Sequence, residues 1–178
     1  MRVTGGEMRG RVIRVADVPG LRPTPSKVRQ AMFNILGSVD GFSMLDLFSG
    51  SGMMAVEAMS RGAMQAISME QHRGAVQAMQ QARAILQLED IWRIESVRVE
   101  RGLKALAGSS FDLIFADPPY AAGYVERLPA LLHEHEIHCG QLVMEESARV
   151  SPVWPAGWLC QQSRRYGDSC LHFLQPTQ

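Results

Sequence analysis

One carboxylate and two prolines form the motif in this sequence with the clearest chemical potential. Asp117-Pro118-Pro119-Tyr120 directly follows 111–116, an apolar run that predicts a buried strand. The prolines restrict the backbone, so the Asp117 carboxylate and the Pro118 carbonyl would be two rigid hydrogen-bond acceptors. Bonds accepted from an exocyclic amine would free its lone pair for attack on an electrophile, and Tyr120 offers a ring on which an unstacked base can lie. We predict that the catalytic group is Asp117, Pro118, Pro119 and Tyr120.

A glycine-rich motif, residues 46–52, lies between another apolar run and a helical pattern. Its glycines permit a tight turn that brings backbone N–H groups close to a ligand. Asp46 puts a carboxylate where the ammonium group of an amino acid could sit, and Glu70, which ends the next apolar run, could accept hydrogen bonds from both hydroxyls of a ribose. These acids favour S-adenosylmethionine as cofactor. The predicted cofactor residues are Asp46, Phe48, Ser49, Gly50, Ser51, Gly52, Glu70 and Gln71.

Other interpretations of these motifs stay open. Gly50, Gly52 and Ala55 also satisfy a dinucleotide fingerprint, with Glu70 near the expected distance, so a nicotinamide or flavin cofactor is an alternative. A pyrophosphate would, however, be repelled by the carboxylate at position 46. Asp117 could belong to a plain turn beside a packed tyrosine, and Glu70 could be a solvated loop residue.

The elements that must position these residues alternate between short apolar runs and longer helical patterns, which predicts a parallel α/β sheet. Right-handed crossovers place the strand ends along one edge, where ligands bind. The predicted strands are 43–48, 66–70, 96–99, 111–116 and 141–145, and the helices are 53–61, 72–86, 102–106 and 121–135. Strands at 158–162 and 169–174, joined by a turn at 166–168, predict a hairpin at the sheet edge.

Upstream of the sheet, residues 24–36 predict a helix with Thr24 as its N-cap and Pro25 at the first position. Residues 7–16 predict a small hairpin that carries three arginines. The helix residues expected on the buried face are Val28, Met32, Ile35 and Leu36.

Charge is distributed unevenly along a chain whose formal net charge is zero. Residues 1–30 hold seven basic side chains and two acidic ones. Clustered cations are typical of a protein that binds a polyanion, because each phosphate contact releases condensed counterions. A solvated tail would give the same composition.

Length and composition limit the remaining possibilities. We expect residues 1–178 to form one domain, with a basic N-terminal hairpin and helix over 1–37 and a catalytic α/β core over 38–178. The three cysteines have no C-x-x-C spacing, so we expect no disulfides. The histidines between 133 and 138 do not share a helix face, so we expect no metal site. No apolar stretch has the length of a membrane span or signal peptide, so we expect a soluble, cytoplasmic protein. The sequence leaves the oligomeric state open and favours a monomer.

Together these motifs resemble the bacterial 16S ribosomal RNA guanine-N2 methyltransferases of the RsmD type, which are class I S-adenosylmethionine-dependent enzymes. The resemblance spans almost the whole chain. Its most particular parts are Leu21-Arg22-Pro23-Thr24 with the following Arg29, and the run from Phe33 to Leu36; Tyr166-Gly167-Asp168 extends it to the C-terminus.

The resemblance implies a Rossmann-like fold: a seven-stranded, mainly parallel sheet with helices on both faces and a C-terminal antiparallel hairpin. It implies S-adenosylmethionine as methyl donor and 16S ribosomal RNA, free or in a partly assembled small subunit, as partner. It also implies that Arg22, Thr24 and Asn34 lie near the cofactor or the entering base. Residues implied to hold the RNA backbone are Arg9, Arg11, Arg14, Arg22, Lys27 and Arg29.

One segment departs from the family pattern. Where related enzymes place an acidic or amide residue against the adenine, this chain reads Val99-Glu100-Arg101-Gly102. Glu100 could take that place by a shift of one position, with Arg101 beside it.

Two rival functions remain compatible with the motifs. A similar tetrapeptide serves methyl transfer to adenine N6 in DNA and to a glutamine amide on a protein. A nucleic-acid-binding module could also retain the fold without catalysis, although binding alone does not require two rigid acceptors beside a cofactor.

Overall fold

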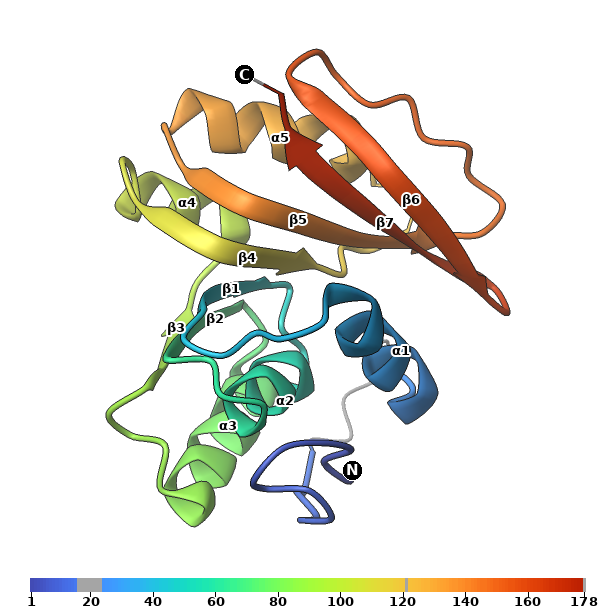
Figure 1. The fold of residues 1–178 in the computed structure, drawn as a ribbon. Helices are drawn as coiled ribbons and strands as arrows, with labels where there is room; N and C mark the ends of the chain where they lie inside the picture. Colours follow the sequence, from blue (N-terminus) through green and yellow to red (C-terminus); the bar gives the residue numbers. More distant parts are fainter. Residues whose placement is uncertain (16–23, 121, 178) are drawn as a thin grey trace.

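A computed structural model describes residues 1–15, 24–120 and 122–177. Seven strands form one sheet in the order β3-β2-β1-β4-β5-β7-β6 (Figure 1). β1 to β5 run parallel, β7 is antiparallel to β5, and β6 is antiparallel to β7. The predicted mainly parallel sheet with a C-terminal hairpin is therefore confirmed. The strands are β1 (Ser43–Leu47), β2 (Gln65–Glu70), β3 (Trp92–Ser96), β4 (Ser110–Ala116), β5 (His138–Ser147), β6 (Trp158–Tyr166) and β7 (Ser169–Pro176).

Five helices in the described part of the chain cover the two faces of this sheet. α1, α2 and α3 lie on one face, and α4 and α5 lie on the other (Figure 1). This arrangement confirms the predicted helices on both faces. The helices are α1 (Ser26–Leu36), α2 (Met53–Ser60), α3 (Arg73–Leu86), α4 (Val99–Ala105) and α5 (Tyr124–Glu134).

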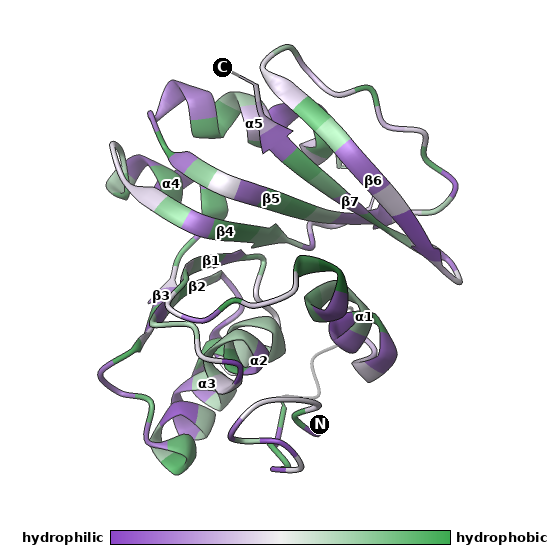
Figure 2. Cartoon of the chain, in the orientation of Figure 1, coloured by the Kyte–Doolittle hydropathy of each residue, from purple (hydrophilic) through white to green (hydrophobic). Residues whose placement is uncertain are grey.

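Side chains of the central strands alternate between two cores, because successive residues of a strand point to opposite faces. In β1, Met44 joins the core under α1 to α3, whereas Leu45 and Leu47 join the core under α4 and α5. Strands covered on both faces are buried along their length, as β1 is at all five positions, Ser43 and Asp46 included. Figure 2 shows hydrophobic stretches in β4, β5 and β7, with hydrophilic residues toward their ends.

The third strand lies earlier in the chain than its sequence pattern suggested. The prediction of a strand at 96–99 is wrong, because β3 spans Trp92–Ser96 and pairs with β2. Trp92 anchors it, with 1% of its side chain exposed. Val99, Gly102 and Leu103 are buried at helical spacing, so the segment after β3 forms α4.

The start of α1 also differs from the prediction. Pro25 itself is the N-cap, with φ −58° and ψ 145°, and no side chain caps the helix, so Thr24 is not the cap. The carbonyl of Pro25 accepts the N–H groups of Val28 and Arg29. Phe33 is buried, whereas Ile35 and Leu36, both predicted on the buried face, are only partly buried.

The N-terminal residues 1–15 dock on α2 instead of forming a free tail. The predicted hairpin over 7–16 is displaced: Met1 to Val3 pair with Arg11 to Ile13 around a single bridge between Arg2 and Val12. Glu57 of α2 is fully buried and accepts hydrogen bonds from the backbone N–H of Thr4 at 2.9 Å and from its hydroxyl at 2.6 Å. This carboxylate ties the N-terminal segment to α2.

The chain changes direction across the sheet between β1 and β4. β1 leads into α2 on one face, whereas β4 leads toward α5 on the other (Figure 1). The carboxyl ends of these adjacent parallel strands leave a crevice between their loops, which is where open α/β sheets bind ligands. In the described part of the chain, no helix has the length and apolar character needed to cross a membrane.

Candidate active site

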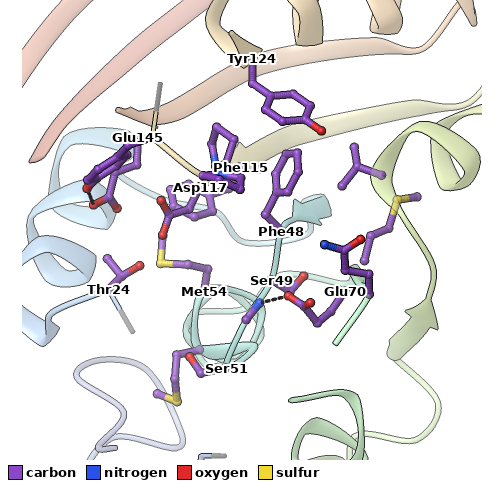
Figure 3. Close-up of a pocket in the computed structure, with 18 of the residues that line it drawn as sticks. Thr24, Phe48, Ser49, Ser51, Met54, Glu70, Phe115, Asp117, Tyr124 and Glu145 are labelled. Carbon is purple, nitrogen blue, oxygen red and sulfur yellow. Dashed lines mark hydrogen bonds between the residues drawn. The ribbon is translucent and has the colours of Figure 1, made fainter. Parts of the chain in front are cut away.

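A cavity of about 520 Å³ opens at the carboxyl ends of β1, β2, β4 and β5 (Figure 3). It extends from the loop after β2, where Glu70 lies, to the loop after β4, where Asp117 lies. The structure thus brings the two predicted motifs to one cavity. The predicted residues that line it are Thr24, Phe48, Ser49, Gly50, Ser51, Glu70, Gln71, Glu100, Asp117, Pro118, Pro119 and Tyr120.

The glycine-rich loop lies in a tight, left-handed backbone conformation. Phe48, Gly50 and Gly52 have φ values of 57°, 53° and 70°. At Gly52 there is no room for a side chain, because a Cβ atom would lie 2.7 Å from the sulfur of Met79 and from a ring carbon of Trp92. Gly52 therefore shapes the turn from behind and does not itself line the cavity.

Glu70 connects this loop to the next one. Its Oε2 accepts the backbone N–H of Gly50 at 2.9 Å, and its Oε1 accepts the N–H of His72 at 2.7 Å. The carboxylate is 6% exposed and lines the cavity. Since a carboxylate oxygen can accept more than one hydrogen bond, both oxygens remain able to accept hydroxyl groups of a ligand.

Asp46 lies behind the cavity wall. It is fully buried at the end of β1 and does not line the cavity, which corrects the prediction of a direct ion pair with a cofactor. Ser68 donates a hydrogen bond of 3.4 Å to its Oδ2, while Oδ1 has no partner in the described part of the chain. Burial raises the pKa of Asp46 to about 7, so a positive charge placed in the cavity would favour its ionised form.

Asp117 stands in the cavity at the end of β4. Figure 3 shows it close to Met54 and Phe115, with Glu145 on the side where Thr24 lies. Burial, and then the negative charges of Glu145, Asp46 and Glu146, raise the pKa of Asp117 to about 8. A carboxyl group shifted this far, in a cavity, is typical of a catalytic position.

Tyr120 leans from the same loop toward β5 and β7. Its hydroxyl lies 2.7 Å from Oγ of Ser169 and donates to Oε1 of Glu145 at 3.2 Å. Burial is the main cause that raises the pKa of Tyr120 to about 12, so the hydroxyl keeps its proton. The ring remains 43% exposed, which leaves a face for a planar ligand.

An aromatic pair forms the wall opposite Glu70. The rings of Phe48 and Tyr124 meet edge to face with centroids 4.7 Å apart (Figure 3). The hydroxyl of Tyr124 donates to Oε1 of Glu100 at 2.7 Å, and this hydrogen bond is the main cause that lowers the pKa of Glu100. Arg127 pairs with the same carboxylate at 3.2 Å. Glu100 therefore lies in the cavity as a fixed anion.

The electrostatics of the cavity fit a cationic ligand. Carboxylates from four separate elements line it, and a fifth lies behind the glycine loop. Arg98 also lines the cavity, but its guanidinium lies 3.7 Å from the Glu100 carboxylate. Among the described residues, no group of His, Cys, Asp and Glu gathers in a way that could hold a metal ion. The carboxylates at the cavity are Asp46, Glu70, Glu100, Asp117 and Glu145.

Comparison with known proteins agrees with this geometry. The family described as Conserved hypothetical protein 95 matches residues 1–175. Ribosomal RNA small subunit methyltransferase D of Escherichia coli strain K12 is 31% identical over 179 residues, which cover 98% of this chain and 89% of that protein. The solved structure of yhhF from Escherichia coli superimposes with a TM-score of 0.87 at 31% identity, over 99% of this chain and 97% of the other.

This chain belongs to the RsmD family. The resemblance inferred from its motifs is confirmed, and so is the class I methyltransferase fold. An RNA methyltransferase from Salinibacter ruber, solved in complex with S-adenosyl-L-homocysteine, shares this fold with a TM-score of 0.68 at 17% identity, over 88% of this chain and 95% of the other.

Two further residues that were predicted near the cofactor, Asn34 and Arg101, lie outside the cavity. Asn34 is on the exposed side of α1 and does not line it. Arg101 lines a smaller, adjoining cavity of about 340 Å³ together with Arg73 and Arg98. Both positions follow from helix geometry, because each residue points away from the buried face of its own helix.

The basic residues that were predicted to bind RNA fall into three groups in this RsmD-family chain. Arg9, Arg11, Arg14 and Lys27 are exposed. Arg29 is fully buried, which corrects the prediction that it contacts RNA: it donates to the carbonyl oxygens of Thr24 and Arg2, and its Nε lies 3.9 Å from Glu57. Arg22 lies outside the described residues.

The sequence interpretation missed Glu145. This residue ends the apolar run of β5 just as Asp117 follows that of β4, and it is 3% exposed inside the cavity. An acid at the carboxyl end of a neighbouring parallel strand is a signal that the sequence does contain. Glu145 is the last residue of the strand predicted at 141–145, so it occupies the same kind of position as Glu70 at the end of its strand.

Proposed function

We propose that this chain transfers a methyl group from S-adenosylmethionine to the exocyclic N2 amine of a guanine in 16S ribosomal RNA. The observation that carries the proposal is the position of Asp117, a mostly buried carboxyl group that follows β4 at the same cavity as the glycine loop. A cavity rimmed with carboxylates suits a cofactor that carries positive charge on its sulfur and its ammonium group. It does not suit the pyrophosphate of a dinucleotide.

The residues that would hold the cofactor lie at the carboxyl ends of β1 and β2. The loop of Ser49 and Gly50 would contact the amino-acid part of the cofactor. Behind that loop, the unpartnered Oδ1 of Asp46 adds negative charge. Glu70 would accept hydrogen bonds from the ribose hydroxyls. Phe48 offers an apolar contact opposite. When bound, S-adenosylmethionine supplies an electrophilic methyl carbon, whose bond to the cationic sulfur breaks as the new nitrogen–carbon bond forms.

The tetrapeptide orients the amine and receives its proton. Asp117 and the carbonyl of Pro118 accept hydrogen bonds from the two N–H groups, which directs the nitrogen lone pair out of the base plane. A positive charge on the cofactor would favour the ionised form of Asp117, and this carboxylate would take up the proton that the nitrogen loses after the nitrogen–carbon bond has formed; its raised pKa suits that role. Tyr120 stacks on the flipped base, an interaction worth about 1–3 kcal/mol.

The RNA backbone would be held by the exposed cations of the N-terminal region. Arg9, Arg11 and Arg14 project from a segment that Glu57 fixes to α2, so their charge has a defined position relative to the cavity. We propose Lys27 as a further contact to the RNA backbone. We also propose that the substrate is the small ribosomal subunit during its assembly in the cytoplasm, and that one copy of the chain binds it.

The direct test is methyl transfer from labelled S-adenosylmethionine to matched acceptors: small ribosomal subunits, naked 16S ribosomal RNA, duplex DNA and protein. We expect label in RNA alone, with Asp117→Asn inactive and Asp112→Asn active. Asp112 is a matched control because it lies on β4, the strand that leads to Asp117, but accepts hydrogen bonds from Ser43, away from the cavity. Transfer only to DNA or to protein would refute the proposal, as would a folded protein that binds no S-adenosylmethionine.

A further inference from the structure

A buried carboxylate oxygen in the active-site cavity has no partner. Glu145 lies near the end of β5 with 3% of its surface exposed, and it lines the cavity. Its Oε1 accepts the hydroxyl of Tyr120, but its Oε2 has no hydrogen-bond partner in the described part of the chain. Leaving such a group unsatisfied costs more than a hydrogen bond returns. The cavity therefore offers a fixed acceptor that a ligand can satisfy.

The direction of this acceptor is set by its neighbours. Tyr120 holds Oε1, and the same hydroxyl lies 2.7 Å from Oγ of Ser169 on β7. Figure 3 shows Glu145 next to Asp117, on the side of the cavity away from Glu70. The carboxylate of Glu145 therefore lies at the Asp117 end of the cavity, which under the proposed function receives the target base, and not at the Glu70 end.

Guanine and adenine differ in what they offer to such an oxygen. Beside the exocyclic amine, guanine carries N1–H, a donor, whereas adenine carries an unprotonated N1, an acceptor. With the amine held by Asp117, the next group along the base edge would face the neighbouring carboxylate. A carboxylate accepts from a donor and repels an acceptor.

We propose that Glu145 is the residue that selects guanine, by accepting a hydrogen bond from N1–H through Oε2. This inference rests on the proposed function of the same site. Asp117 binds the reacting amine, and Glu145 binds the adjacent ring nitrogen. The hydroxyl groups of Tyr120 and Ser169 keep the carboxylate of Glu145 in place. A site built to bond a substrate N–H rejects an analogue without it by up to about 10⁴-fold, because the buried acceptor then stays unpaired.

The matched substrate is 2-aminopurine, which has the same exocyclic amine as guanine but no N1–H. Small subunits would be reconstituted with 16S RNA that carries either base at the methylated position, and kcat/KM would be measured for both. We expect the wild type to favour guanine by at least about 100-fold. In Glu145→Gln the amide can donate to N1 of 2-aminopurine, so the ratio should fall below about tenfold.

Glu146→Gln is the control, because Glu146 is equally buried but does not line the cavity, and its Oε1 accepts the N–H of Ser147. This variant should keep the wild-type ratio. An unchanged ratio in Glu145→Gln would overturn the inference, as would loss of S-adenosylmethionine binding in calorimetry, which would assign Glu145 to the cofactor. If Glu145→Gln does not fold, the wild type suffices as a test: a ratio of kcat/KM for guanine to kcat/KM for 2-aminopurine near one would overturn the inference. A wild type that binds the cofactor but methylates no guanine would instead refute the proposed function.

Discussion

Replacing Asp117 by asparagine should stabilise the protein while it abolishes methyl transfer. The pKa of Asp117 rises from an ordinary 3.8 to about 8 in the folded chain, so its ionisation opposes folding. Because the folded pKa is raised, the free energy of unfolding falls as the pH climbs from about 4 to about 8. Each pKa unit corresponds to about 1.4 kcal/mol, which gives about 6 kcal/mol as the upper limit.

Water in the open cavity screens the charge, so we expect Asp117→Asn to gain about 2–3 kcal/mol above pH 8. For a domain of this length that gain raises Tm by about 5–10 °C. The measurement is thermal unfolding of both proteins between pH 4 and pH 9. The gain should be small near pH 4 and should grow until about pH 8.

Asp112→Asn is the control of opposite sign. Hydrogen bonds from Ser43 lower the pKa of Asp112, so this carboxylate contributes stability above the unfolded pKa, and its replacement should destabilise the protein at neutral pH. An Asp117→Asn protein that is no more stable than the wild type at pH 8.5, or whose gain is independent of pH, would refute the assignment of Asp117 as a carboxyl group held at an unfavourable site.

Three further predictions concern the supports of the site. Glu57→Gln should cost about 3–5 kcal/mol in urea unfolding, because it leaves a buried guanidinium without its counter-charge; a loss below 1 kcal/mol would contradict this. Gly52→Ala should cost more stability than Gly37→Ala, since both have positive φ but only at Gly52 does a Cβ meet neighbours at 2.7 Å; equal losses would count against the close packing. Glu70→Ala should weaken S-adenosylmethionine binding in calorimetry at least about tenfold, whereas Glu95→Ala on β3 should not; equal affinities would remove Glu70 from the site.

Much of the sheet could be predicted because its central strands are mostly apolar. Residues 43–47 and 113–116 are buried in adjacent strands, and their patterns hold no competing helical period. The segment at 92–99 could not be predicted in this way. Trp92, Ile94 and Val99 fit a strand and a helix equally well, and the packing of Leu103 decides that Val99 starts α4.

The candidate site was predictable where function depends on strand ends, and less so where it depends on packing. Asp117 follows an apolar run and Glu70 ends one. Because the carboxyl ends of parallel strands meet at one edge of the sheet, both residues could be predicted at the same site, and both line the cavity. Arg29 could not be distinguished from its exposed neighbours, because its burial depends on a partner, Glu57, on another helix. Asp46 was correctly placed at a strand end, but its full burial follows from strands on both sides.

The most direct test of the account is nucleoside analysis of 16S ribosomal RNA from cells that lack this protein, complemented with the wild type or with Asp117→Asn. We predict that mass spectrometry finds one N2-methylguanosine fewer in the deletion strain, restored by the wild type and not by Asp117→Asn. An unchanged guanosine methylation pattern in the deletion strain, or full restoration by Asp117→Asn, would contradict the central claim that this carboxylate directs methyl transfer to guanine.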